Sequence, residues 1–231
     1  MLDVEGTTTP IDFVHKTLFP FARERMFDFV KSNLAGLQSE IADLRAEHQK
    51  DLQKGEFSLP LDELSVESIV AYLHYLIDND RKSTALKSIQ GKIWCEGYEN
   101  KRLIGEVFDD VPDALKRWKH EGKTIAIFSS GSILAQKLIF GYSTAGDLTS
   151  YISAYFDTTS GSKRDAESYQ KIASMLGFPP AEILFLSDVI SELDAAFAAG
   201  VQCKLSIRPN NPLPEKPSIF DFFYNFTEIC V

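Results

Sequence analysis

Two acids near the start of the chain, Asp3 and Glu5, have the spacing of a catalytic pair. One oxygen of the Asp3 carboxylate could attack an electrophile and form a covalent intermediate. Glu5 could protonate the leaving oxygen and later activate a water molecule. Gly6 follows directly and allows the tight turn that would bring both acids to the same atom. Acid pairs are common in turns, so the pair alone is weak evidence for catalysis.

Further polar residues come directly after apolar runs. The run TIAIF ends at Ser129, Ser130 and Gly131. Lys163 lies in the segment after AYFDT, and Asp188 ends EILFLSD. A hydroxyl pair at the start of a helix can hold phosphate oxygens together with backbone N–H groups. A lysine can neutralise charge that develops on a transferred group.

This set of residues suits phosphoryl transfer. A phosphate monoester carries about two negative charges, so a carboxylate nucleophile needs a cation to screen them. Asp3 and Asp188 could supply carboxylates to Mg²⁺, which is often held by one or two carboxylates together with a substrate phosphate. Each residue also has a structural interpretation, since Asp188 could cap a helix and Lys163 could be a surface lysine.

Alternating strand and helix patterns position these residues from about residue 107 onward. Such alternation indicates βαβ units and a parallel sheet, at whose carboxyl edge ligands bind. Asp110 is expected to cap the first helix of this region, and Gly122 to end it. Strands are expected at TIAIFSS, AYFDT, EILFLSD and VQCKLSI, with helices at about 133–141, 165–176 and 192–199. The aromatic tail FDFFYNF is expected to pack onto this core.

Residues 12–105 have helical spacing and no convincing strand. Apolar positions recur at helical intervals up to about residue 54 and again from 66 to 94. The predicted organisation is therefore an α/β core of residues 1–10 and 107–231, with a helical cap of residues 11–106. Only two residues precede Asp3, so either the first strand is very short or the sequence begins at a late start or a trimmed end. A truncated strand is expected to hold Asp3 poorly.

The composition limits the possible partners. The 231 residues carry a formal net charge of −9, which argues against a general binder of nucleic acids or membrane surfaces, because both are polyanionic. Three scattered cysteines without a CxxC pair predict neither a disulfide framework nor a thiolate zinc site. Without a leader or an apolar run of about 20 residues, a cytoplasmic protein is expected.

The motifs together resemble a known family. DVEGTT, FSSGS, GSK and FLSDVISELDAA resemble, in order and spacing, the four motifs of the haloacid dehalogenase (HAD) superfamily of phosphohydrolases. Longer segments, among them LDVEGTTTPIDFVHKTLFPFAR and SSGSILAQKLIFGYSTAGDL, resemble the acireductone synthases, the bifunctional enolase-phosphatases of methionine salvage. The resemblance covers nearly the whole chain and implies a Rossmann-like core with a parallel sheet and an inserted α-helical cap.

The resemblance also implies a reaction. The enzyme would enolise 2,3-diketo-5-methylthiopentyl-1-phosphate and then remove its phosphate, giving the acireductone 1,2-dihydroxy-3-keto-5-methylthiopentene. The implied cofactor is Mg²⁺, the implied partner is this small phosphate substrate, and a monomer is expected. The alternatives are a HAD phosphatase of another small phosphate ester and a catalytically dead HAD-like binding protein.

The same resemblance implies roles for individual residues. It implies that Asp3, Glu5 and Asp188 form the metal site, with Glu5 contributing its backbone carbonyl. Substrate contacts are implied for Ser129, Ser130, Gly131 and Lys163, and catalytic roles for Asp3, Glu5 and Lys163. Outside this set, Glu192 and Asp194 are expected in a solvated first turn of a helix, with support of the metal ligands as the lesser alternative for Glu192. His15 is expected to be packed and hydrogen-bonded rather than catalytic, with substrate contact as the lesser alternative.

Overall fold

The computed structural model describes residues 1–213 and 218–230, which form two compact units. Unit 1 comprises Met1–His15 and Ile104–Val231, and unit 2 comprises Lys16–Leu103. This division assigns residues 11–15 and 104–106 to the α/β unit, whereas the predicted borders follow residues 10 and 106. None of the helices in the described ranges is both long enough and apolar enough to cross a bilayer.

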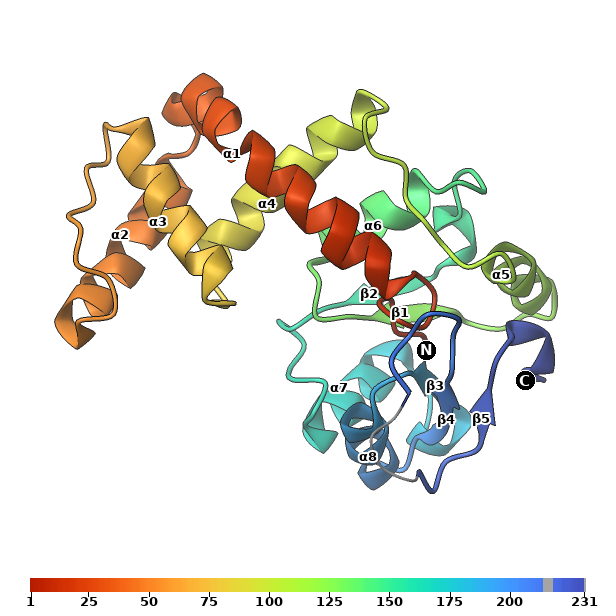
Figure 1. Cartoon of the computed structure of the whole chain (residues 1–231). Coiled ribbons are helices and arrows are strands. Elements are labelled where there is room, and N and C mark those ends of the chain that lie inside the picture. The colour runs from red at the N-terminus through yellow and green to blue at the C-terminus, as the bar shows by residue number, and fades with distance from the viewer. Residues whose placement is uncertain (214–217, 231) are drawn as a thin grey trace. The chain divides into compact units, whose positions relative to one another are not determined.

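A parallel sheet forms the centre of unit 1 (Figure 1). Leu2 bridges to Ile127 on one side and to Leu186 on the other, which joins the two groups of strands. The order across the sheet is therefore β2-β1-Leu2-β3-β4-β5. The strands are β1 (Ala126–Phe128), β2 (Ala154–Phe156), β3 (Leu184–Ser187), β4 (Gln202–Ser206) and β5 (Phe222–Phe223).

The start of the chain is the central strand of this sheet, although it is very short. The backbone N–H of Leu2 donates to Ala126 O at 2.8 Å, and the N–H of Asp3 donates to Leu186 O at 2.9 Å. Leu186 N in turn donates to Met1 O at 3.1 Å. Strands on both sides thus hold the backbone before and at Asp3. The short strand does not leave Asp3 poorly held, as a truncated strand was expected to do, because both neighbouring strands hydrogen-bond to this segment.

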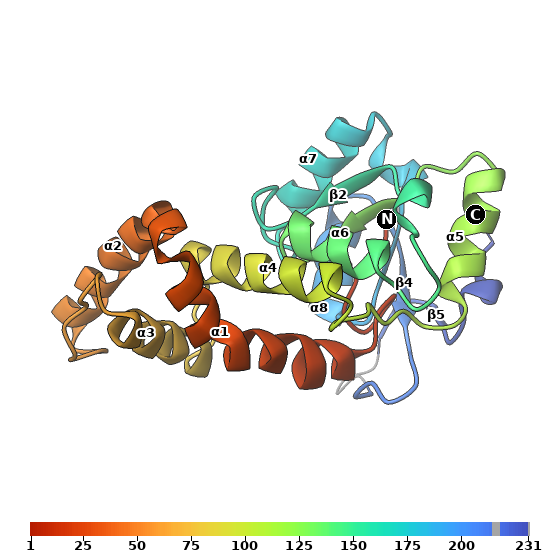
Figure 2. The same ribbon diagram turned by 90° about the horizontal axis from the view of Figure 1, so that it is seen from above.

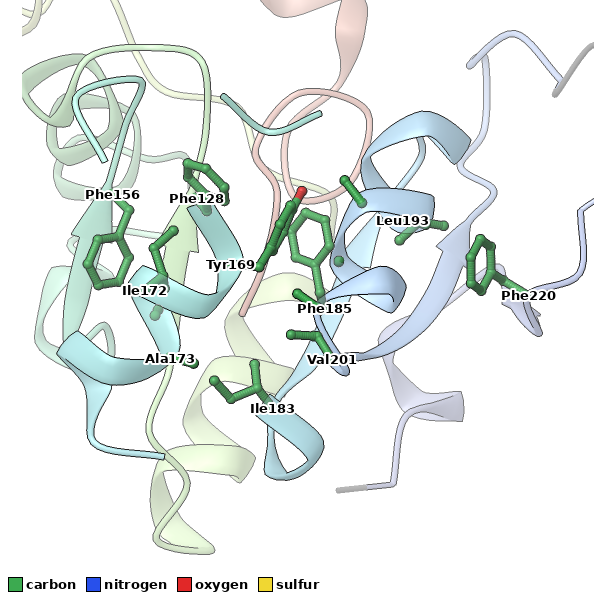
Figure 3. Close-up of a cluster of buried hydrophobic side chains, with 14 of the residues drawn as sticks. Phe128, Phe156, Tyr169, Ile172, Ala173, Ile183, Phe185, Leu193, Val201 and Phe220 are labelled. Atoms are coloured by element: carbon green, nitrogen blue, oxygen red, sulfur yellow. The ribbon is translucent and has the colours of Figure 1, made fainter. Parts of the chain in front are cut away.

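The described part of unit 1 contains four α-helices in addition to the sheet. A hydrophobic cluster fills the space between the sheet and two of them (Figure 3). Phe128 and Phe185 enter it from the strands, Tyr169 from α7 and Leu193 from α8, and all four are buried. Burying such a side chain stabilises the fold by roughly 1.5–3 kcal/mol. The helices are α5 (Val111–His120), α6 (Ile133–Gly141), α7 (Ala166–Leu176) and α8 (Ile190–Ala198), and short 3₁₀ turns lie at Thr149–Tyr151, Pro180–Glu182 and Phe226–Glu228.

These elements confirm the predicted fold class and strand–helix alternation, and the buried Phe223 and Phe226 confirm that the aromatic tail packs onto the core. The prediction for Asp110 is wrong. It occupies the N-cap position of α5 without a side-chain capping bond. Its Oδ2 instead accepts from Arg208 Nη1 at 2.7 Å and from the N–H of Phe226 at 2.6 Å.

Unit 2 consists of helices only, and within it α1 packs against α3 and α4 while α2 packs against α4 (Figure 2). Side chains of Ser65 and Ser83 cap α3 and α4. The helical region expected up to residue 54 is interrupted by a 3₁₀ turn at Leu34–Gly36. The helices are α1 (Phe19–Asn33), α2 (Gln38–Lys54), α3 (Val66–Asp78) and α4 (Thr84–Glu99), and a π-helical segment, Phe13–Leu18, precedes α1.

Candidate active site

Polar residues of unit 1 follow neighbouring strands at one edge of the sheet. Asp3 comes directly after Leu2, Ser129 after β1 and Asp188 after β3. The strands are parallel and Leu2 is in register with Ile127 and Leu186, so these three positions lie at the same carboxyl edge. The loop after β2 delivers Lys163 to the same group.

Asp3 is buried, with 4% of its surface exposed, and donors orient both of its carboxylate oxygens. Lys163 Nζ lies 2.6 Å from Oδ1, which also accepts from the N–H of Val4 at 2.7 Å. The hydroxyl of Ser187 lies 3.1 Å from Oδ2. These contacts fix the carboxylate in one orientation at the end of the central strand.

Lys163 is a buried cation rather than a surface lysine, since 5% of it is exposed. Its ammonium pairs with Asp3 and, at 2.5 Å, with Glu192 Oε2. The hydroxyl of Tyr169 donates to the Lys163 carbonyl at 2.7 Å and holds the backbone there. Burial opposes the charge of Lys163, but the two carboxylates more than offset it and raise its pKa above the ordinary value. Lys163 therefore stays charged.

Glu192 is buried at the site, against the favoured expectation from the sequence. It was expected in a solvated turn, but it is 8% exposed and pairs with Lys163. The sequence feature that indicates such a residue is an acid in the first turn of the helix that follows a strand, here Glu192 in α8 after β3. Burial, followed by the charge of Asp3, raises the pKa of Glu192 to about 7. Asp194, two residues on, is exposed as expected.

Ser187 connects the two carboxyl groups. Its Oγ lies 3.1 Å from Asp3 Oδ2 and 3.0 Å from Glu192 Oε2. A hydroxyl has one proton to donate, so both contacts are hydrogen bonds only when one carboxyl group carries a proton. The raised pKa of Glu192 favours a proton on this carboxyl group at a higher pH than is usual for a glutamate.

Asp188 packs directly against Gly6. Gly6 has a φ of +73°, and a Cβ at this position would lie 2.1 Å from Asp188 Oδ2. Only glycine therefore fits the turn after Asp3. Burial, followed by the charge of Asp3, raises the pKa of Asp188 to about 8. Asp188 does not cap α8, whose N-cap residue is Val189.

The Glu5 carboxylate points toward solvent and meets His15. Glu5 Oε1 lies 2.7 Å from His15 Nε2, and the two side chains are 42% and 59% exposed. His15 is therefore hydrogen-bonded, as expected, but it is not packed in the interior. A carboxylate with this exposure can exchange protons with a substrate or with water.

The turn after β1 leads into α6. Ser129 is buried, and its Oγ accepts from the N–H of Gly131 at 3.1 Å. Ser130 and Gly131 are exposed. Ser132 caps α6 by accepting from the N–H of Ala135. The turn therefore presents backbone groups at a helix N-terminus, an environment that favours anions.

Comparison with known proteins agrees with this architecture. A family model for haloacid dehalogenase-like hydrolases matches residues 1–200. Enolase-phosphatase E1 of Synechococcus elongatus is 51% identical over 218 residues, which cover 93% of this chain and 90% of the relative. The chain belongs to the enolase-phosphatase E1 family of haloacid dehalogenase-like hydrolases. The Drosophila persimilis enolase-phosphatase E1 is 45% identical over 215 residues, covering 91% of this chain and 85% of the relative.

A solved structure supports the same family at the level of the fold. The crystal structure of the UTR4 protein of Saccharomyces cerevisiae superposes with a TM-score of 0.78 and 33% identity. The match covers 99% of this chain and 97% of the yeast chain. The Rossmann-like core expected for the family is therefore present here.

The charge balance of this enolase-phosphatase E1 site fits a cation. Burial, and after it the charge of Asp3, raises the pKa values of Asp188 and Glu192, so ionising all three acids would leave an excess of negative charge. Within residues 1–213 and 218–230, Lys163 is the one lysine or arginine that pairs with any of these three carboxyl groups. A further cation would relieve the excess.

The donor atoms fit Mg²⁺ in particular. The carboxylates of Asp3 and Asp188 offer oxygen donors, the kind of ligand that Mg²⁺ prefers. In the described part of the chain, no group of three His, Cys, Asp or Glu side chains is arranged to hold a metal. A carbonyl or water would therefore complete the set. None of the described residues donates to the Glu5 carbonyl, whereas its neighbours Val4 O and Gly6 O both accept hydrogen bonds.

Proposed function

We propose that this protein is a Mg²⁺-dependent acireductone synthase of methionine salvage. It would enolise 2,3-diketo-5-methylthiopentyl-1-phosphate and then remove the phosphate to give 1,2-dihydroxy-3-keto-5-methylthiopentene. The observation that carries the proposal is the buried Asp3 carboxylate, oriented by Lys163 and Ser187 at the end of the central strand. Relatives named enolase-phosphatase E1, up to 51% identical, support the choice of substrate.

In the phosphatase half-reaction, Asp3 acts as the nucleophile. One of its oxygens attacks phosphorus, the bond from phosphorus to the substrate oxygen breaks, and an aspartyl-phosphate forms. Glu5 donates the proton that the leaving oxygen needs. Glu5 then takes a proton from water, which attacks the aspartyl-phosphate and releases inorganic phosphate. The 42% exposure of the Glu5 side chain is compatible with both proton transfers.

Charge stabilisation comes from the residues around Asp3. Lys163, whose raised pKa keeps it charged, neutralises the phosphoryl group as charge develops on it. Ser129 and Ser130, with the N–H groups that lead into α6, hold the phosphate oxygens. Bound Mg²⁺, held by Asp3, Asp188 and the Glu5 carbonyl, would screen the phosphate and favour the enol.

The helical unit 2 is proposed to be a cap that excludes water during transfer. Its sequence, rather than the metal site, would then determine substrate choice. The protein is proposed to act as a monomer in the cytoplasm, on a small phosphate ester and without a nucleic-acid or membrane partner.

The test is phosphate release by the full chain from the diketo-phosphate and from a panel of sugar and aryl phosphates, with and without Mg²⁺. The diketo-phosphate is expected to have the highest kcat/KM. Asp3→Asn and Asp188→Asn are expected to lose turnover while they remain folded. Asp194→Asn, an exposed change on the same helix as Glu192, is the matched control and should act as wild type.

Three results would count against the proposal. Wild-type rates in Asp3→Asn or Asp188→Asn would refute the catalytic assignment. A sugar phosphate as the best substrate would indicate a phosphatase of other specificity. No Mg²⁺-dependent release from any ester would indicate a binding protein.

A further inference from the structure

The loop that follows Asp3 is a closed turn whose carbonyls are held from outside. Within the turn, the N–H of Gly6 donates to Thr9 O and the N–H of Thr9 donates to Val4 O, both at 2.8 Å. The carbonyls of Gly6 and Thr7 are not used inside the turn. They accept from side chains of another segment of unit 1, residues 206–211.

Two side chains of this segment hold the loop. Asn211 Nδ2 donates to Gly6 O at 2.8 Å, and Arg208 Nε donates to Thr7 O at 3.0 Å. The Ser206 hydroxyl lies farther from the same Gly6 oxygen, at 3.4 Å. The segment begins at the last residue of β4, so residues some 200 positions apart in the sequence are joined at the loop.

Arg208 is itself rigidly placed. It is 4% exposed, pairs with Asp110 at 2.7 Å and donates to Tyr224 O at 2.9 Å. Its guanidinium lies 4.7 Å from the ring centre of Phe108 and 4.3 Å from that of Phe226. With its charge paired inside the fold, Arg208 serves as an anchor for the segment rather than as a substrate contact.

The turn after Arg208 aims Asn211 at the loop. The N–H of Asn211 donates to Arg208 O at 3.2 Å, and Asn210 between them has a φ of 64°. This tight turn places the Asn211 amide beside Gly6, because a Cβ on Gly6 would lie 3.0 Å from Asn211 Nδ2. The same Cβ would lie 2.1 Å from Asp188 Oδ2. Gly6 is therefore in contact with both Asn211 and Asp188.

We propose that Asn211 is a positioning residue for the metal site, with Arg208 as its anchor. By donating to Gly6 O, the side-chain amide of Asn211 sets the distance between the Asp188 carboxylate and the backbone carbonyl of Glu5, the residue that precedes Gly6. It touches neither the substrate nor the ion. This inference rests on the proposed function, which makes Asp188 and the Glu5 carbonyl ligands of Mg²⁺. Partners that orient metal ligands typically change metal affinity by 10–100-fold.

The test measures Mg²⁺ binding to the full chain by calorimetry, without substrate, in Asn211→Ala. We expect binding to weaken by about tenfold or more and the Mg²⁺ concentration for half-maximal activity to rise in parallel. Turnover at saturating Mg²⁺ should change far less. Asn210→Gly is the matched control, since it removes an exposed neighbouring side chain and tolerates the positive φ. It should bind Mg²⁺ as the wild type does.

Further variants keep the proposal testable if Asn211→Ala unfolds. Asn211→Leu retains the volume but not the donor and should weaken Mg²⁺ binding equally. Arg208→Lys keeps the charge and a donor and should lose less affinity than Arg208→Met. Wild-type Mg²⁺ affinity in a folded Asn211→Ala or Asn211→Leu protein would overturn the positioning role alone. A wild-type protein that neither binds Mg²⁺ nor releases phosphate would overturn the proposed function and this inference together.

Discussion

Replacing Lys163 by methionine removes the cation that pairs with two buried carboxyl groups. Lys163 lies 2.6 Å from Asp3 and 2.5 Å from Glu192, and all three are less than 10% exposed. Loss of one partner of a buried ion pair typically costs about 3–5 kcal/mol, because it leaves an uncompensated buried charge. For a chain of this length, about 1 kcal/mol shifts the melting temperature by 2–4 °C. Lys163→Met should therefore melt about 6–20 °C lower than the wild type near pH 9.

The deficit should depend on pH with a definite sign. The pKa of Glu192 is raised to about 7 by burial and by Asp3, and it rises further once Lys163 is gone. A group with a raised folded-state pKa stabilises the fold at low pH and loses that contribution as the pH rises through its pKa. The difference in melting temperature between variant and wild type should therefore be smaller near pH 5.5, where Asp3 is the main group that loses its cation, and largest near pH 9.

The assay is thermal unfolding by near-ultraviolet circular dichroism in EDTA, at about pH 5.5 and about pH 9. Lys171→Met is the matched control, because Lys171 is an exposed lysine on α7. In a Glu192→Gln background, Lys163→Met should cost less, since one of the two buried charges is already absent. Equal melting temperatures for Lys163→Met and Lys171→Met at both pH values would refute the reasoning.

Three further predictions concern the acids and the turn. Because Asp188 has a pKa of about 8 without metal, Mg²⁺ must displace a proton below that pH. Calorimetry should thus show Mg²⁺ affinity rising by up to about tenfold per pH unit below pH 8, and a constant affinity between about pH 6.5 and 8.5 would contradict this. Gly6→Ala should abolish phosphate release and lower the free energy of unfolding by at least about 1 kcal/mol, because its Cβ would meet Asp188 at 2.1 Å and its φ is +73°; wild-type activity and urea midpoint would disprove the close approach. Glu5→Gln should slow release from alkyl phosphates far more than from nitrophenyl phosphate, whose leaving group needs no proton; equal slowing of both would exclude the acid role.

The alternation of elements in unit 1 could be predicted because each βαβ unit carries its own signals. TIAIF and EILFL are continuous apolar runs, typical of strands that are buried on both faces, and β1 and β3 form there. The break at Leu34–Gly36 could not be predicted, since helical spacing continues on both sides of it. The sequence also could not predict how firmly the short first strand is held, because its hydrogen bonds go to Ala126 and Leu186, which are remote in sequence.

The site residues that follow strand ends could be predicted from the sequence. The residues whose burial or hydrogen bonding depends on a partner far away in the sequence could not. Asp3 and Lys163 come from different segments and meet in an ion pair, as expected for one edge of a sheet. The solvated turn was favoured for Glu192 because a charged first turn of a helix is usually solvated, and its burial depends on Lys163 from a different loop. Asp110 was assigned to a local cap, but its partner Arg208 is 98 positions away.

The most direct measurement is a crystal structure of the full chain grown with Mg²⁺ and inorganic phosphate. The account predicts one Mg²⁺ bound to carboxylate oxygens of both Asp3 and Asp188 at about 2.0–2.1 Å, with a phosphate oxygen in its coordination shell. An ion that binds without either aspartate, or a phosphate bound away from Asp3, would contradict it.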